Sequence, residues 1–109
     1  MRFGLKEEVI QRICSIIHSY PSVEKVILFG SRAKGCHNPG SDIDLTLVGD
    51  AITSTERDRI LLALDDLFLP YIIDLNLLRQ ITSEDLREHI DRVGVEFCSC
   101  PDSGVEEDE

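Results

Sequence analysis

The sequence has no tryptophan, only two tyrosines and four phenylalanines, and no excess of basic residues. Lys plus Arg total 11 against 21 Asp plus Glu, so the formal net charge is −10. A protein that wraps nucleic acid through its general surface needs a cationic excess. We therefore expect no general nucleic-acid binding.

Long apolar segments are also missing. The longest uninterrupted run, residues 67–73, contains Pro70 and is far too short to cross a bilayer. The first residues lead into a charged amphipathic stretch and not into the apolar centre of a signal peptide. These features predict a cytoplasmic protein with no membrane partner.

No C-x₂-C pair occurs among the four cysteines, which disfavours a structural zinc site. Cys14 lies on the apolar stripe of a predicted helix, where we expect a buried free thiol that acts as a small hydrophobe. Cys36 stands beside His37 in a predicted loop, and Cys98 is separated from Cys100 by one residue. The sequence assigns no function to these four residues. The pattern favours a reducing compartment over a disulfide framework.

Length and charge distribution define the domain organisation. The 109 residues, 42% of them apolar, are enough for one modest core. Residues 101–109 hold five acids and no base. We expect one domain over residues 1–100 and an acidic tail over residues 101–109 that is too polar to order by itself.

Hydrophobic periodicity predicts helices that alternate with short strands. Thr53 and Glu56 have capping-box spacing and open a long helix, with Phe68 on its inner face and Pro70 after it. Thr82 is predicted to start the final helix, because threonine is a favoured N-cap residue. The pattern predicts an α/β (α+β) domain in which helices back a small mixed sheet. The expected segments are helix 6–19, strand 26–29, a short helix from 31, strand 41–48, helix 53–69, strand 71–77, helix 82–93 and strand 95–97.

Gly30 and Ser31 stand where a buried strand turns into a helix. Glycine allows the backbone to approach a ligand closely, and a helix N-terminus offers unpaired N–H groups to an anion. The alternative is an ordinary strand-to-helix turn that Ser31 caps.

Three aspartates interrupt two predicted strands. Asp42 and Asp44 share one face of the 41–48 strand, with Cα atoms about 6.5 Å apart. Like charges at this distance repel one another, and a hard cation such as Mg²⁺ removes the penalty. Asp74 lies in an otherwise apolar run, where a lone carboxylate is disfavoured without a metal or partner. If the two strands are neighbours, three carboxylates converge in an arrangement suited to one or two divalent ions and to nucleotidyl transfer. The alternative is a solvated polar face.

A Gly-Ser pair, ten intervening residues, Asp-x-Asp and a later single Asp on a strand together resemble the nucleotidyltransferase superfamily that includes DNA polymerase β. Within it, residues 29–35 (FGSRAKG) followed by residues 41–45 (SDIDL) resemble the minimal nucleotidyltransferase (MNT) proteins. The resemblance covers residues 6–97. It implies a nucleotidyltransferase fold.

The resemblance also implies residue roles. Gly30 and Ser31 would bind the triphosphate of an incoming nucleotide. Asp42 and Asp44 would ligate Mg²⁺, and Asp74 would complete a second metal site and help to deprotonate the acceptor hydroxyl.

Three further residues carry open alternatives. Arg32 and Lys34 would contact the β- and γ-phosphates or would simply be solvated. The family often has arginine where Lys34 stands, and lysine lacks the planar fork of arginine. Ser41 would either bond a phosphate or cap the entrance to its strand.

Larger members of the superfamily use a further domain to hold the nucleotide base or the acceptor, so here a second copy of the chain or a different protein is expected to supply that surface. MNT proteins of this size typically pair with a small helical HEPN ribonuclease as a toxin–antitoxin module. The resemblance thus implies an antitoxin that transfers AMP from ATP to a tyrosine of the HEPN toxin, with ATP and two Mg²⁺ ions. An acidic surface complements a basic RNA-cutting partner. The alternatives are a non-catalytic antitoxin that acts by binding, and a nucleotidyltransferase that acts on a small molecule or an RNA end.

Overall fold

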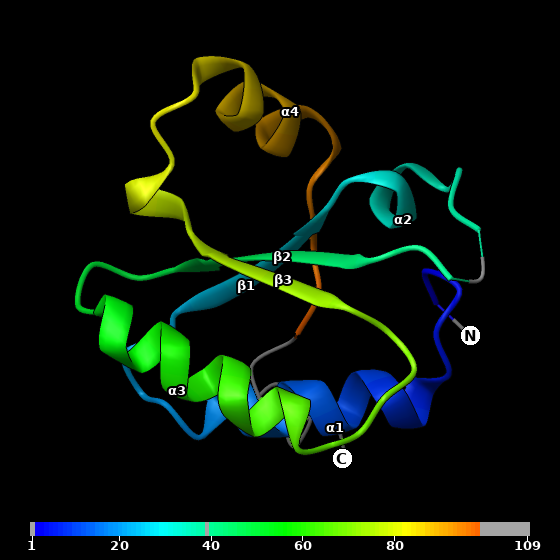
Figure 1. Cartoon of the computed structure of the whole chain (residues 1–109). Helices are drawn as coiled ribbons and strands as arrows, with labels where there is room; N and C mark the ends of the chain where they lie inside the picture. The colour runs from blue at the N-terminus through cyan, green and yellow to red at the C-terminus, as the bar shows by residue number, and fades with distance from the viewer. Residues whose placement is uncertain (1, 39, 99–109) are drawn as a thin grey trace, which may run out of the picture.

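A mixed four-stranded sheet forms the middle of the computed structural model, which describes residues 2–38 and 40–98 (Figure 1). The strand order is β3-β2-β1-β4. β1 pairs antiparallel with both β2 and β4, while β2 pairs parallel with β3. This confirms the predicted small mixed sheet. The strands are β1 (Lys25–Phe29), β2 (Ile43–Val48), β3 (Ile73–Leu77) and β4 (Val95–Glu96).

Helices lie on both sides of the sheet (Figure 1). α1 (Glu7–His18) and α3 (Ser54–Asp65) lie side by side below it in this view, and α2 (Ser31–Lys34) and α4 (Glu84–Val93) lie above. A short 3₁₀ helix, η1 (Leu78–Gln80), joins β3 to α4. The hydrophobic core draws buried side chains from α1, α3 and the strands, among them Ile10, Ile13, Ile17, Val26, Leu28, Leu45, Leu47, Ile60, Leu64 and Leu75. Among the described residues no helix is long and apolar enough to cross a membrane.

The start of α3 is as predicted, but its end is not. The Thr53 hydroxyl accepts a hydrogen bond from the Glu56 N–H at 3.1 Å, and the Glu56 carboxylate accepts one from the Thr53 N–H at 3.1 Å. The helix ends at Asp65, and Phe68 has a positive φ of 52° and is 86% exposed. The placement of Phe68 on the inner face is therefore wrong, because helical periodicity stops applying where the backbone leaves the helix.

Two hydroxyl residues also differ from expectation. Ser83 caps α4, with its hydroxyl accepting from the Leu86 N–H at 3.2 Å, so the prediction of Thr82 is wrong by one residue. Two adjacent hydroxyl residues satisfy the same capping rule, and the pattern cannot choose between them. Thr46 is fully buried and donates to the Asn76 carbonyl at 3.4 Å, so this face of β2 is not solvated along its whole length.

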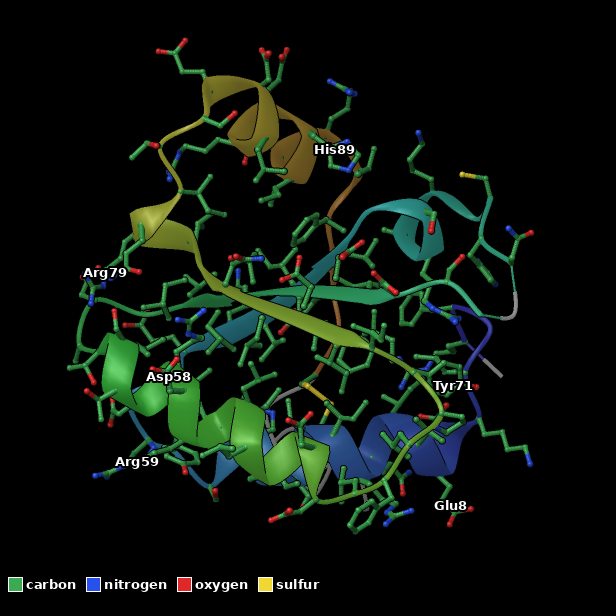
Figure 2. The ribbon with its side chains drawn as sticks, in the orientation of Figure 1. Glu8, Asp58, Arg59, Tyr71, Arg79 and His89 are labelled. Carbon is green, nitrogen blue, oxygen red and sulfur yellow. A yellow bond between two sulfur atoms is a disulfide. The ribbon has the colours of Figure 1, made fainter. Side chains whose placement is uncertain are left out.

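Cys14 and Cys98 form a disulfide with a Cα–Cα distance of 5.6 Å, which Figure 2 shows as a yellow bond. The expectation of a free thiol at Cys14 is wrong. The partners are 84 residues apart, and sequence spacing cannot reveal that pairing. The bond removes the cysteine argument for a reducing compartment. Cys36 is an exposed free thiol, whereas Cys100 and the predicted tail lie outside the described residues.

Candidate active site

The parallel pairing of β2 and β3 places two of the predicted aspartates side by side. Asp44 is the register partner of Asp74, and the Ile43 N–H donates to the Ile72 carbonyl at 2.9 Å. Paired residues of neighbouring strands project to the same face. The condition set by the sequence, that these two strands are neighbours, is therefore met. Asp42 is exposed and lies just before the first residue of β2.

The pKa of Asp44 shows how these carboxylates influence one another. Partial burial raises the pKa of Asp44 above its ordinary value of 3.8, and the charges of Asp74 and Asp42 raise it further, while His89 acts in the opposite direction. Asp42 and Asp74 are exposed. The repulsion expected from the sequence is thus present where β2 and β3 begin. We call this group of Asp42, Asp44 and Asp74 the acidic edge.

Carboxylate oxygens are the donors that Mg²⁺ prefers, and neutralising the repulsion around Asp44 is what a divalent ion would do. The chemistry of the donor set therefore fits the metal. Over residues 2–38 and 40–98, however, no three His, Cys, Asp or Glu side chains are already gathered into a group that could hold a metal ion. The carboxylates are near enough to interact but are not closed into a ready ligand set, so their roles as ligands stay predictions.

The turn between β1 and α2 lies directly against this acidic edge. Gly30 has φ 82° and ψ −157°, a conformation that essentially only glycine adopts. A Cβ atom at Gly30 would lie 2.3 Å from Oδ2 of Asp44. Glycine is therefore required here both for its backbone angles and for the close approach to Asp44. The structure brings together the Gly-Ser and Asp-x-Asp motifs, which the sequence separates by ten residues.

Ser31 is the first residue of α2 and is half-buried. The N-cap of α2 is Gly30, and no side chain caps the helix. The alternative in which Ser31 is merely the capping residue of an ordinary turn is therefore wrong. The prediction that Gly30 and Ser31 bind a triphosphate stays open.

His89 of α4 completes the surroundings of the turn, and no pattern in the sequence pointed to this residue. The Gly30 N–H donates to Nε2 of His89 at 3.2 Å. The imidazole meets the Phe29 ring edge-on, with centroids 6.2 Å apart. Figure 2 places His89 on the helix above the sheet. His89 and Gly30 are 59 residues apart, and only folding brings them together.

Arg32 lies inside the protein, with a side chain only 2% exposed. Its Nε and Nη2 donate to the Ser41 carbonyl at 3.1 and 2.9 Å, and its Nη1 donates to the Phe3 carbonyl at 2.7 Å. The guanidinium also lies over the Tyr71 ring, 5.1 Å from the centroid. The solvated alternative is wrong for Arg32. Its side chain ties the N-terminal turn to the loop that leads into Asp42.

Ser41 and Lys34 have different surroundings. The Ser41 hydroxyl accepts from the Asn38 N–H at 2.9 Å, and its own N–H donates to the Asn38 carbonyl at 3.0 Å, so Ser41 shapes the loop before β2. Lys34 is exposed on α2. Phosphate contacts from Arg32, Lys34 and Ser41 remain predictions.

Replacing Arg32 with alanine is expected to lower the free energy of unfolding by about 2–4 kcal/mol, because the carbonyls of Ser41 and Phe3 lose charged donors. Lys34→Ala on the same helix is the matched control and is expected to stay within about 0.5 kcal/mol of wild type. Urea unfolding measures both variants. Equal stability of the two variants would show that Arg32 does not hold the two segments together.

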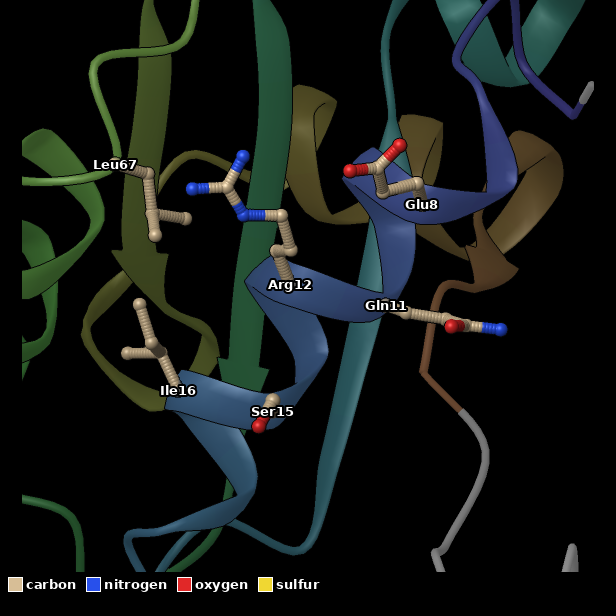
Figure 3. A pocket seen from close by; sticks show the side chains of 6 residues that line it. All are labelled: Glu8, Gln11, Arg12, Ser15, Ile16 and Leu67. Atoms are coloured by element: carbon tan, nitrogen blue, oxygen red, sulfur yellow. The ribbon is translucent and has the colours of Figure 1, made fainter.

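A separate cavity of about 520 Å³ lies on the α1 side of the sheet (Figure 3). It is far from the acidic edge in the fold, because α1 covers the sheet face opposite to α2 and α4. None of the predicted site residues lines it, so the cavity adds nothing to the candidate site. Its lining residues are Glu8, Gln11, Arg12, Ser15, Ile16 and Leu67.

Comparisons with known proteins agree with this geometry. The family model described as polymerase beta, nucleotidyltransferase, matches residues 11–102. The probable protein adenylyltransferase MntA of Haemophilus influenzae is 35% identical over 95 residues, which is 86% of this chain and 82% of that protein. The family model therefore spans nearly the whole domain and includes all the residues of the candidate site.

Two solved structures share the fold. A toxin–antitoxin with AMP-PNP has a TM-score of 0.66 and 23% identity, over 91% of this chain and 77% of that one. The complex of a tri-AMPylated Shewanella oneidensis HEPN toxin with its MNT antitoxin has a TM-score of 0.65 and 18% identity, over 94% of this chain and 79% of that one. These likenesses confirm the fold class predicted from the sequence.

Proposed function

Because the chain belongs to the polymerase beta nucleotidyltransferase family, we propose that it is a Mg²⁺-dependent protein adenylyltransferase that transfers AMP from ATP to a tyrosine hydroxyl of a helical HEPN toxin and thereby acts as its antitoxin. One observation carries the proposal. Asp44 and Asp74 are register partners on parallel strands, and the Gly30 turn lies against Asp44. A carboxylate pair beside a glycine turn is what nucleotidyl transfer requires for charge neutralisation and phosphate binding.

Likeness to known proteins supports the proposed substrate and partner. The related MntA is named as a protein adenylyltransferase, and the structural neighbours include an AMPylated HEPN toxin with its MNT antitoxin. Asp42 and Asp74 are exposed, so an acceptor side chain of another protein can approach them. The net charge of −10 favours a basic partner. The use of ATP implies a cytoplasmic reaction.

In this proposal Asp42, Asp44 and Asp74 would hold Mg²⁺, with two ions as the expected number. Bound Mg²⁺ supplies positive charge that offsets the charge developing on the transferred phosphate and on the leaving pyrophosphate. The backbone at Gly30 and the side chain of Ser31 would bind the triphosphate and fix its orientation.

The transfer step is a displacement at the α-phosphorus of ATP. The acceptor tyrosine oxygen forms a bond to this phosphorus, and the bond from phosphorus to the pyrophosphate oxygen breaks. Asp74 is more exposed than its register partner Asp44 and would accept the proton of the tyrosine hydroxyl. Arg32 contributes indirectly, because its bonds to the Ser41 carbonyl hold the loop that presents Asp42.

Mass spectrometry tests the proposal. The chain is incubated with ATP, Mg²⁺ and the helical protein encoded by the neighbouring reading frame, and we expect the partner to gain one or more AMP units. Asp42→Ala should abolish the gain, whereas Asp65→Asn, at the exposed end of α3, should not. Neutralisation of the toxin with no mass change would identify a non-catalytic antitoxin. AMP on RNA or on a small molecule would identify a different acceptor.

A further inference from the structure

The hydrogen bond between Gly30 and His89 occupies the donor that the proposed function assigns to a phosphate. Each backbone N–H carries one hydrogen, and here it points at Nε2 of His89 at 3.2 Å. We propose that His89 takes the place of a nucleotide phosphate oxygen in the free protein, so that nucleotide binding must displace its imidazole from the Gly30 N–H. This inference rests on the proposed function, since it needs the Gly30 turn to be the phosphate site.

The direction of the hydrogen bond indicates that His89 competes with a phosphate for the Gly30 N–H and does not help to bind the phosphate. Nε2 accepts the bond, so its lone pair faces the turn and the ring proton lies on Nδ1. A lone pair in this position repels a phosphate oxygen and cannot donate to it. The phosphate oxygen carries negative charge and is the stronger acceptor. It is therefore expected to win the Gly30 N–H once nucleotide is present.

The surroundings show what the contact does without nucleotide. The acceptor that the Gly30 N–H bonds does not come from α2, the helix that it precedes. His89 supplies it from α4, and its ring is held edge-on to Phe29 at 6.2 Å. The contact thereby fixes α4 against the turn. Displacement would free the ring from Phe29 and loosen α4 beside the acidic edge.

Two variants of similar volume distinguish the effect of the hydrogen-bond acceptor of His89 from the effect of its ring. His89→Leu keeps an apolar side chain against Phe29 but offers no acceptor, and His89→Gln keeps an acceptor at similar reach but has no ring. Without competition, His89→Leu is expected to bind Mg²⁺ with AMP-PNP about two- to tenfold more tightly than wild type. His89→Gln is expected to bind within about twofold of wild type. Isothermal titration calorimetry measures the affinities.

Nitrogen-15 NMR of the wild-type imidazole gives a second measurement that does not depend on a variant folding. Nε2 should be unprotonated and hydrogen-bonded in the free protein, and its resonance and that of the Gly30 amide should both shift when Mg²⁺ and AMP-PNP are added. Together these results would support displacement.

Other outcomes overturn the inference in distinguishable ways. Weaker binding by His89→Leu would make His89 a direct phosphate ligand, and unchanged binding with an unmoved Nε2 resonance would make it a packing residue. In both cases the proposed function stands, because wild type still binds. Failure of wild type to bind Mg²⁺ with AMP-PNP would overturn the proposed function and the inference together.

Discussion

Replacing Asp44 with asparagine is expected to reduce AMP transfer by about a thousandfold or more and, at the same time, to raise the melting temperature of the free protein. The loss of transfer follows because Asp44 lies against the Gly30 turn and is the register partner of Asp74. It therefore adjoins both the proposed phosphate site and the proposed metal site. The gain in stability follows because burial and the charges of Asp74 and Asp42 raise the pKa of Asp44. Single-turnover transfer assays and thermal unfolding measure the two effects.

The raised pKa of Asp44 also sets the sign of the pH dependence. The folded protein holds this proton more tightly than the unfolded chain, so ionisation of Asp44 destabilises the fold as pH rises through the window above 3.8. The stability advantage of Asp44→Asn should therefore be full at neutral pH and shrink as pH falls toward 4. Asp65→Asn, at the exposed end of α3, is the matched control. An asparagine variant less stable than wild type at pH 7 would contradict this electrostatic account.

Gly30→Ala is expected to reduce transfer by about a hundredfold, because the new methyl group would displace the Asp44 carboxylate from its place beside the turn. The Cβ would lie 2.3 Å from Asp44 Oδ2. The backbone conformation also opposes alanine and should cost about 1–3 kcal/mol of stability. Transfer assays and urea unfolding measure both effects.

Gly35→Ala provides the matched control for Gly30→Ala. Gly35 has the same φ of 82°, but apart from its chain neighbours no atom of the described residues lies within 4 Å of its Cβ position. This variant should lose about 1–2 kcal/mol from left-handed strain and keep its activity. If both glycine variants lost activity equally, backbone strain and not the contact with Asp44 would be the cause.

The sequence predicted those parts of the site that depend on local chemistry. A glycine between a buried strand and a helix, and carboxylates placed in apolar strands, each conflict with simple packing and so attract notice. The sequence left the adjacency of the two aspartate strands as a condition, and the pairing of Asp44 with Asp74 is known only from the register of the folded sheet. The place of Asp44 against Gly30 is a consequence of the β1–β2 pairing, in which Phe29 faces Asp44.

What escaped prediction depends on contacts between distant segments. His89 reaches Gly30 from α4, and Cys14 bonds to Cys98, which is 84 residues away in the sequence. Arg32 resembled a surface residue because its acceptors are backbone carbonyls, which every residue carries. Phe68 followed the helical period but lies beyond the last helical turn. Neither composition nor periodicity contains information on such partners.

The central claim is that the aspartates and the Gly30 turn form one site for Mg²⁺ and ATP, and thermal unfolding of the free chain with and without the two ligands tests it most directly. With ligand at about 100 times its Kd, linkage predicts a rise in melting temperature of roughly 10 °C for a domain of this size. The rise should require both Mg²⁺ and ATP and should be absent in Asp44→Asn. An unchanged melting temperature for wild type at millimolar Mg²⁺ and ATP, or an equal rise in Asp44→Asn, would contradict the claim.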